Sequence, residues 1–273
     1  MLNTDRDEEH SMPFPETKRV IYNKNPLDNV ICQLRFPPIL MIDSEVPSGF
    51  QNAIRNEYPL YEEKTEVVHE FTAGLKPQFP QEVINQLSNT SINKNHEFTS
   101  EDGVWKINLT RTFISISTAK YRRWEHFKDK FKNSYDALIK YYNPPFFTRI
   151  GLRYIDLFCR ESLDLQETDW NELIQPQLLG FLSTEIKENV LNYNGVFDVK
   201  LADESSSVRI ATSFVNNLDN QTCFMVDSDF YSTKRVIQDQ LTEKLNFLNS
   251  RSSRLIRWII KDKLHLAMEP NEL

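Results

Sequence analysis

The pattern of hydrophobic and polar residues predicts its clearest strand at residues 25–40. Pro26 begins this strand, at a position where a missing backbone N–H does not weaken a sheet. Pro37 and Pro38 follow it and prevent further pairing. The apolar residues expected to be buried along it are Val30, Ile31, Cys32, Leu34 and Phe36.

The chain repeats this pattern. Residues 150–154 show the same apolar, leucine, arginine and aromatic order as residues 32–36, about 120 residues further along. In both halves a short helix, further strands and a long helix follow, which is β-α-β-β-β-α in outline. This order resembles the saddle-shaped repeat of TATA-binding-protein-type folds, a likeness of topology that carries no function.

We therefore expect an α+β fold of two pseudo-repeated halves, whose antiparallel sheets are covered by long helices. The halves are expected at residues 19–145 and 146–273, as one compact unit. A flexible segment at residues 1–18, which is polar, acidic and interrupted by prolines, precedes them.

Apolar residues at three- and four-residue steps predict the helices. A short helix is expected at residues 48–58, where Ser48 caps the first turn and Pro59 follows the last. The clearest helix spans residues 124–143, ahead of two prolines. In the second half, helices are expected at residues 176–182 and 233–268, the longer one with a break near residues 250–253.

Alternation of apolar and polar residues predicts the remaining strands. Residues 105–110 alternate strictly, but the apolar positions change phase at residues 112–114. Because one rigid strand cannot change its inward face, we expect a bulge or a tight turn there. The other strands are expected at residues 20–22, 66–75, 96–100, 147–158, 186–201, 208–217 and 222–231.

The composition is that of an acidic globular protein. Aromatic residues make up 12% of the chain, so large rings are expected to fill the core. The formal net charge of −7 argues against attraction of the whole surface to nucleic acid or to an anionic membrane. No apolar run approaches the roughly 18 residues that cross a bilayer, and no signal-peptide pattern begins the chain. A cytoplasmic protein without a membrane partner is therefore expected.

The three cysteines, Cys32, Cys159 and Cys223, lie far apart in the sequence. Each is set in an apolar, strand-like run, and their number is odd. These features favour small core residues over a disulfide framework or a metal site.

No motif for a cofactor or for covalent catalysis is present. The chain lacks G-x-S-x-G, Walker, G-x-G-x-x-G and C-x-x-C sequences, and its five histidines show no zinc or catalytic spacing. With 6 glycines in the whole chain, a phosphate-cradling loop is not expected. A Ser/His/Asp triad built from distant residues stays open. We expect no cofactor, no resident metal and a non-catalytic protein.

Arg35 and Arg153 hold equivalent positions in the two repeats, within otherwise apolar strands. An unpaired buried guanidinium is very costly, so each needs a partner, for which Asp156 and Asp227 are candidates. The simpler interpretation is a structural ion pair that clamps strand to helix. The alternative is an anion or ligand site between the two halves.

Asp227 and Asp229 stand two residues apart in a predicted strand, so both carboxylates should face the same side. A divalent metal site requires such a pair, and a metal-dependent nuclease would be centred on it. No histidine or third acid lies at nuclease-like spacing, however, so solvent-facing acids fit the pattern better.

Basic side chains gather on both long helices of this acidic protein. In the last helix, Arg254, Arg257 and Lys261 are expected to share one face, with Arg251 nearby. An acidic partner or a phosphate backbone would dock on that face. The alternative is an ordinary solvated face.

Several stretches resemble a sporadically distributed family of uncharacterised bacterial proteins of about this length. Its N-x-P-L…Q-L-R-F-P-P-x-L opening motif corresponds to residues 25–27 and 33–40, and its T-x-x-Y-x-x-W-x-x-F step to residues 118–127. Its R-hydrophobic-G-L-R-Y strand corresponds to residues 149–154. The resemblance brings no reaction and no catalytic residue. Because patchy occurrence is typical of mobile cargo and antiviral loci, it implies a role in bacterial defence.

The chain departs from that family at three places. Ser228 stands where an apolar residue is usual in the late hydrophobic-D-hydrophobic-D step. A Leu-His pair and an Ile-Thr pair in the last helix are replaced by residues 248–249 and 259–260, which are Leu-Asn and Ile-Ile.

The sequence thus favours a non-catalytic binding, adaptor or sensor protein whose partner is another protein. Nucleic-acid binding through the basic helices or the sheet saddle is the alternative, and a metal-dependent nuclease is the third hypothesis. The oligomeric state stays open. The candidate binding residues are Arg35, Arg153, Asp227, Asp229, Arg251, Arg254, Arg257 and Lys261.

Overall fold

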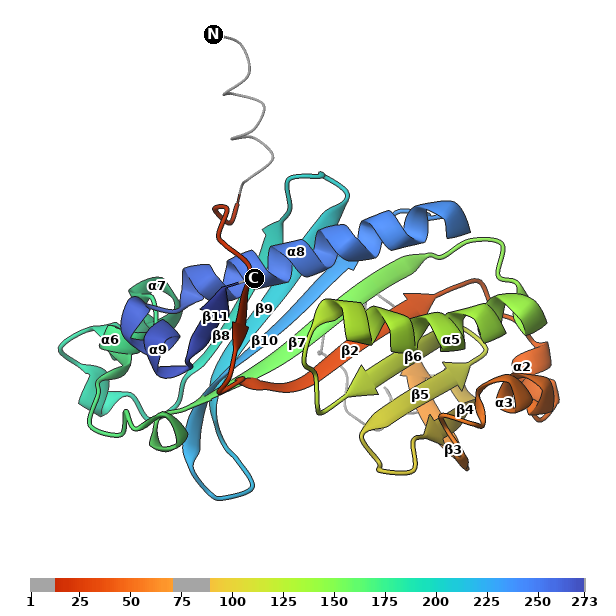
Figure 1. Ribbon diagram of the computed structural model, residues 1–273, viewed down its shortest axis with the longest axis horizontal. Helices are drawn as coiled ribbons and strands as arrows, with labels where there is room; N and C mark the ends of the chain where they lie inside the picture. The colour runs from red at the N-terminus through yellow and green to blue at the C-terminus, as the bar shows by residue number, and fades with distance from the viewer. Residues whose placement is uncertain (1–12, 71–88, 273) are drawn as a thin grey trace, which may run out of the picture.

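The computed structural model describes residues 13–70 and 89–272, with side chains described for residues 13–65 and 94–272. In this part of the chain, nine antiparallel strands form one sheet in the order β3-β4-β5-β6-β2-β7-β10-β9-β8 (Figure 1). Its strands are β2 (Leu27–Arg35), β3 (Leu60–Glu70), β4 (Asn89–Thr99), β5 (Trp105–Thr110), β6 (Phe113–Thr118), β7 (Arg149–Cys159), β8 (Asn194–Lys200), β9 (Ser206–Asn216) and β10 (Thr222–Ser232).

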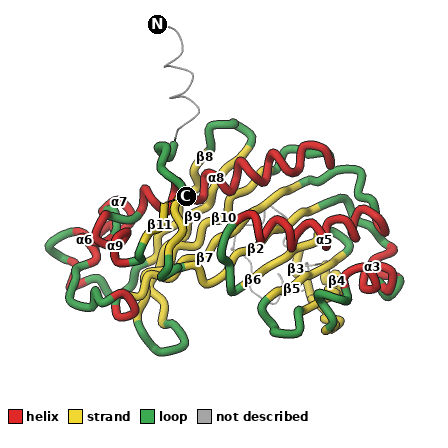
Figure 2. The backbone as a smooth tube through the Cα atoms, in the orientation of Figure 1, coloured by secondary structure: helices red, strands yellow, loops and turns green. Residues whose placement is uncertain are grey.

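Two long helices cover one face of this sheet, and no described helix covers the other (Figures 1 and 2). Helix α5 packs on β6, and helix α8 packs on β7 and β10. None of the described helices is long and apolar enough to cross a membrane. The α+β class expected from the sequence is confirmed. The helices are α2 (Met41–Ser44), α3 (Ser48–Ile54), α5 (Trp124–Tyr142), α6 (Trp170–Leu173), α7 (Pro176–Leu179), α8 (Leu241–Ile259) and α9 (Asp262–Ala267).

The antiparallel pair β2–β7 occupies the middle of the sheet. Cys32 lies opposite Leu152, and Leu34 lies opposite Ile150. All four of these side chains are fully buried on the helix side. Because successive side chains of a strand point to opposite faces, the residues between them lie on the face without helices, which we call the open face.

Strand alternation correctly located the end of β5. The tight turn at residues 111–112 joins β5 to β6, so the change of phase marks two strands. Four strands follow the short helices of the first half, whereas three follow those of the second, so the β-α-β-β-β-α outline is wrong by one strand for the first half. Of the strand predicted at residues 66–75, residues 71–75 lie outside the described part of the chain.

Several helix boundaries differ from the prediction, among them the end of α3 at Ile54 and the start of α8 at Leu241. Ser48 is the first residue of α3 and does not cap it, because Pro47 holds the N-cap position without a side-chain hydrogen bond. Helix α8 continues through residues 250–253, since burial of Leu248 and Leu255 on both sides outweighs the modest helix propensity of serine. The break comes at Ile260, after which α9 begins.

A small second sheet ties the start of the described chain to its end. β1 (Val20–Tyr22) pairs antiparallel with β11 (Pro270–Glu272). The preceding residues, expected in a flexible segment, are also held in place: Phe14 is buried against Trp258 on α8. Residues 1–12 of that segment lie outside the described part.

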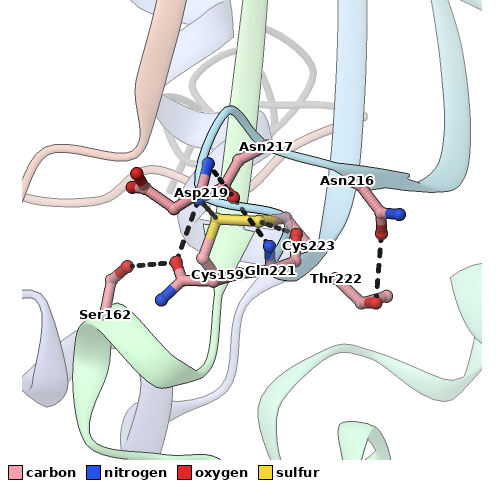
Figure 3. Close-up of a disulfide and its surroundings, with 8 residues drawn as sticks. All are labelled: Cys159, Ser162, Asn216, Asn217, Asp219, Gln221, Thr222 and Cys223. Carbon is pink, nitrogen blue, oxygen red and sulfur yellow. Dashed lines mark hydrogen bonds between the residues drawn. A yellow bond between two sulfur atoms is a disulfide. The ribbon is translucent and has the colours of Figure 1, made fainter.

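The structure corrects the prediction for two of the cysteines. Cys159 and Cys223 lie opposite each other on β7 and β10, and their sulfur atoms form a disulfide (Figure 3). The hairpin turn beside it is held by Asn217, whose side-chain oxygen accepts a hydrogen bond from the Gln221 backbone N–H at 2.8 Å. Cys32 is buried and free, as expected of a core residue.

The Cys159–Cys223 disulfide links residues 64 positions apart, which restricts the unfolded chain. We expect its reduction to lower the free energy of unfolding by up to about 4 kcal/mol, the value that loop-closure entropy gives for that length. Urea unfolding with and without dithiothreitol measures the difference. The Cys159→Ala/Cys223→Ala variant should unfold at the lower urea concentration whether or not reductant is present. Identical unfolding curves of the native chain in both conditions would contradict this expectation.

Candidate binding surface on the open face of the sheet

The open face presents charged side chains at the centre of the sheet. Alternation along β2 places Gln33 and Arg35 there, because the intervening Leu34 is in the core. Along β7 the same rule places Arg149, Gly151 and Arg153 on the open face, and along β10 it places Asp227 and Asp229 there. Four of the residues proposed from sequence, Arg35, Arg153, Asp227 and Asp229, therefore share one surface.

Arg153 forms a two-point ion pair with Asp227. Its Nε donates to Asp227 Oδ1 at 2.7 Å, and its Nη2 donates to Asp227 Oδ2 at 2.5 Å. These bonds raise the pKa of Arg153. Asp227 is one of the two acids suggested as partner, and the pair joins β7 to β10. It therefore clamps strand to strand across the open face, whereas the sequence suggested a clamp from strand to helix.

Arg149 forms a second pair, which Gly151 makes room for. Arg149 Nη2 donates to Asp229 Oδ2 at 2.6 Å, and the guanidinium carbon lies 5.0 Å from the ring centre of Tyr231. A Cβ atom on Gly151 would lie 2.5 Å from Arg149 Nη1, so the guanidinium occupies the space that a side chain would fill. Glycine is thus required here for the close approach of Arg149.

Gln33 connects the two central strands through its side-chain oxygen. This oxygen accepts hydrogen bonds from Arg35 Nε at 3.1 Å and from Arg149 Nη1 at 3.4 Å. Arg35 and Arg149 also lie directly opposite each other in the β2–β7 register. Two like charges face each other at this point, and within the described chain no acidic side chain pairs with Arg35.

A shallow cavity of about 540 Å³ lies over these residues. Its lining is mostly polar and comes from β2, β6, β7 and their neighbours, including Ile31, Asn108, Phe113 and Ser117 beside the arginines. Three arginines and two aspartates on this part of the open face, all but Asp227 lining the cavity, give a local charge of +1 in a chain whose net charge is −7. We call the set of Gln33, Arg35, Arg149, Arg153, Asp227 and Asp229 the arginine–aspartate cluster.

Asp229 is the electrostatically exceptional member of this cluster. Burial raises its pKa, against the opposing effect of Arg149 and Arg153. When the pKa of a carboxyl group stays above its ordinary value beside two cations, the carboxylate is poorly hydrated. Its negative charge therefore depends on those two arginines.

The two aspartates are paired with arginines, and this pairing does not suit a metal site. Both face the same side, as expected, but each carboxylate accepts hydrogen bonds from an arginine. A divalent ion would have to displace both guanidinium groups. Among the side chains of residues 13–65 and 94–272, no group of three His, Cys, Asp or Glu residues is placed to hold a metal ion.

The basic residues expected on the last helix do not form a common free face. Arg251 is buried, with its guanidinium 4.7 Å from the ring centre of Phe247. Arg254 pairs with Glu16 at 2.5 Å, and Arg257 pairs with Asp262 at 2.6 Å. Lys261 follows the end of α8 and donates to the backbone oxygen of Asn171, so the prediction that it shares a helical face with Arg254 and Arg257 is wrong.

Sequence reasoning missed Arg149, Gly151 and Gln33 as members of the cluster. The signal was present, because residues 149, 151 and 153 alternate with the apolar residues of the same strand. The partners of Arg149 could not be inferred, since they depend on the register between β7 and β10.

Comparison with known proteins does not identify the chain's relatives: no protein-family model matches it, and no curated protein matches it.

We expect Arg149→Met to destabilise the protein by about 1–3 kcal/mol at neutral pH, because it leaves the poorly hydrated Asp229 without its hydrogen-bonded cation. The substitution should raise the pKa of Asp229 further, so the loss of stability should shrink as the pH falls and this carboxyl is protonated. Carboxyl-carbon NMR titration and urea unfolding at several pH values provide the two measurements.

The matched control is Arg209→Met, which breaks the exposed pair between Arg209 and Asp198 on the outer strands of the same sheet. It should change stability by less than about 1 kcal/mol. Equal losses in the two variants would show that the central pair has no special role.

Proposed function

We propose that this protein is a non-catalytic binding or adaptor protein that holds another protein on the open face of its sheet. The observation that carries the proposal is the arginine–aspartate cluster, a set of charges at the centre of a face that no described helix covers. Interfaces use such charges to select a partner and to fix its orientation.

The charges of the cluster favour a protein partner over nucleic acid. Arg149 and Arg153 already donate to aspartates, so a phosphate would compete with Asp229 and Asp227 for the same guanidinium groups. A protein surface, by contrast, supplies both acidic and basic groups and suits a face of mixed sign. Arg35, which has no acidic partner in the described chain, is the cation best placed to meet an acidic side chain of the partner.

Two observations also weaken the rival functions. Nucleic-acid binding through the last helix would need free cations, but Arg254 and Arg257 are paired and Arg251 is buried. A nuclease centred on Asp227 and Asp229 would need both carboxylates released from their arginines.

We further infer that the chain contains an internal duplication with a saddle-like sheet. The strand order β4-β5-β6-β2 on one side of the centre matches β8-β9-β10-β7 on the other, with β3 as an additional edge strand. A long helix follows each set, α5 in the first and α8 in the second. This symmetry supports halves at residues 19–145 and 146–273 and brings Arg35 and Arg149 together at the join.

The wider context of the proposal rests on the resemblance of the sequence. A place in a bacterial antiviral defence system follows from the sporadic occurrence of the family that the chain resembles. A cytoplasmic location is part of the same proposal, and the disulfide between Cys159 and Cys223 argues against it, because disulfides are rare in reducing compartments.

Charge reversal at the cluster tests the proposed partner surface. Arg35→Glu should abolish capture of a stoichiometric protein partner from the native host, since it places a negative charge at the position that faces the partner. The fold should be retained because the Arg35 side chain is exposed. Quantitative mass spectrometry of the captured proteins gives the measurement.

Lys263→Glu makes the same change of charge on α9, on the helix side, and should leave capture intact. Recovery of the same partner with both variants would contradict the proposed surface. Recovery of nucleic acid, with affinity that falls steeply as salt rises, would favour the rival function.

A further inference from the structure

A second cavity lies on the helix side of the sheet, away from the arginine–aspartate cluster. It measures about 110 Å³ and is enclosed by β1, the start of α5, the middle of α8 and the central strand β7. Figure 1 shows β1 crossing this side of the sheet between α8 and the first turn of α5. Four elements from different parts of the sequence therefore meet around one small space.

Asp156 lies in the wall of this cavity and has no partner among the described residues. It is 2% exposed, on the core side of β7. In the described chain no hydrogen bond or ion pair reaches its carboxyl group, and its Oδ2 atom is fully buried. Burial raises the pKa of Asp156 to about 8, so at neutral pH the group is mainly the neutral acid. In the neutral acid one oxygen donates and the other accepts, and because Oδ2 is fully buried, Oδ1 is the oxygen that faces the cavity.

Neighbouring cations do not satisfy this carboxyl. Burial is what shifts its pKa, so no arginine is close enough to offset it. Arg19 is held by Glu125 through two hydrogen bonds of 2.7 and 2.8 Å, and Arg257 is held by Asp262. A buried polar group normally finds a partner, and one without a partner in a cavity indicates that the partner comes from outside.

The walls around Asp156 suit a flat ring. Aromatic side chains line the cavity from three elements: Tyr22 on β1, Trp124 on α5 and Tyr154 on β7. Tyr154 donates its hydroxyl to Asn249 Oδ1 at 3.0 Å, which leaves the Asn249 amide N–H groups available to a ligand. Rings stack on such surfaces, and the polar groups fix their orientation.

The mouth of the cavity carries free cations. Arg122 and Arg123 are exposed, line the cavity and have no ion pair in the described chain. Both lie directly before the first residue of the long helix α5. Arginine binds phosphate through two parallel hydrogen bonds, so this pair is suited to an anionic group outside the cavity.

We propose that this cavity binds a nucleotide whose base presents an unprotonated ring nitrogen, as adenine does. The Asp156 carboxyl donates its proton to this ring nitrogen through Oδ1, the oxygen that is not closed off by the protein. The edge of the base enters the cavity, whose volume is somewhat below the roughly 150 Å³ that holds benzene. The sugar lies in the open mouth, and the phosphate is bound by Arg122 and Arg123. This site is separate from the partner surface on the open face, so either proposal can fail alone.

The proposal predicts a specific dependence on pH. As the pH rises through about 8, Asp156 loses its proton and can no longer donate to the ring nitrogen. The tyrosines around it do not titrate in that range: burial raises the pKa of Tyr22 to about 12 and raises those of Tyr121 and Tyr154. Burial lowers the pKa of His265, which bonds to Tyr22, so its ring is neutral above pH 7. The cations that face the site are Lys18, Arg19, Arg122, Arg123 and Arg257. Three of them are paired with acids: Lys18 with Glu272, Arg19 with Glu125 and Arg257 with Asp262.

Isothermal titration of the full chain with adenosine monophosphate tests the proposal. We expect binding at pH 7 and an affinity about tenfold lower at pH 9, which follows from a carboxyl that titrates near pH 8.

Asp156→Leu should abolish binding. Asp156→Asn keeps one donor and one acceptor at every pH, so it should retain binding and lose the pH dependence. Both variants remove an unpaired buried acid, so thermal unfolding at pH 9 should show midpoints no lower than that of the native chain.

The phosphate contact has its own control. Arg122→Gln/Arg123→Gln should reduce the affinity for the monophosphate to that for adenosine, while Lys128→Gln, further along α5, should leave both affinities unchanged. Absence of binding at millimolar monophosphate at pH 7 would overturn the proposal, as would equal binding by the native chain and Asp156→Leu.

Discussion

The antiparallel pairing of β2 with β7 is the constraint on which the rest of the structure depends. It joins the two halves of the chain in a single sheet and fixes which side chains face the helices. In this register, Cys32 and Leu34 meet Leu152 and Ile150 in the core. A slip of one residue would move the apolar set of one strand to the open face and bring Arg35 or Arg153 into the core. The cost of burying an unpaired guanidinium therefore protects the register in addition to apolar burial.

The same pairing gives the two faces of the sheet different chemistry. On the open face, Arg149 and Arg153 pair with aspartates of the neighbouring strand, and Gly151 provides the space that lets Arg149 reach Asp229. On the helix side the interior is apolar, and Asp156 is the acid that stays buried within it without a described partner. A carboxyl in that setting opposes folding at neutral pH, because the unfolded chain ionises it freely. Its presence is more readily explained by a ligand than by stability.

Strand alternation and helical periodicity predicted much of this architecture. The change of phase after residue 110 located a turn, and the apolar steps of residues 124–143 located α5 almost to the residue. The alternation of odd and even positions along a strand could also have decided between the two candidate partners of Arg153, Asp156 and Asp227. An odd-numbered arginine and the even-numbered Asp156 must lie on opposite faces of β7, which leaves Asp227 on the neighbouring strand.

What the sequence could not supply was the register between strands distant in the chain. The disulfide joins Cys159 and Cys223 because β7 and β10 align them, and nothing in their local surroundings indicates this. The break predicted at the serines of α8 was wrong for a related reason. The low helix propensity of serine favoured a break, but burial of the flanking leucines in the core keeps the helix continuous. The pairing of Arg254 with Glu16 likewise depends on the path of the N-terminal segment across α8.

Hydroxyl-radical footprinting of the protein with its captured partner tests whether the open face is the partner surface, because it reports on the accessibility of individual side chains. Ile31, Phe113 and Tyr231 lie on the open face and are accessible in the free protein, whereas Trp258 and Leu266 are exposed on the helix side. The account predicts that the partner protects the first group and leaves the second unchanged. Protection of Trp258 and Leu266, with the open-face residues still oxidised at their free rates, would contradict it.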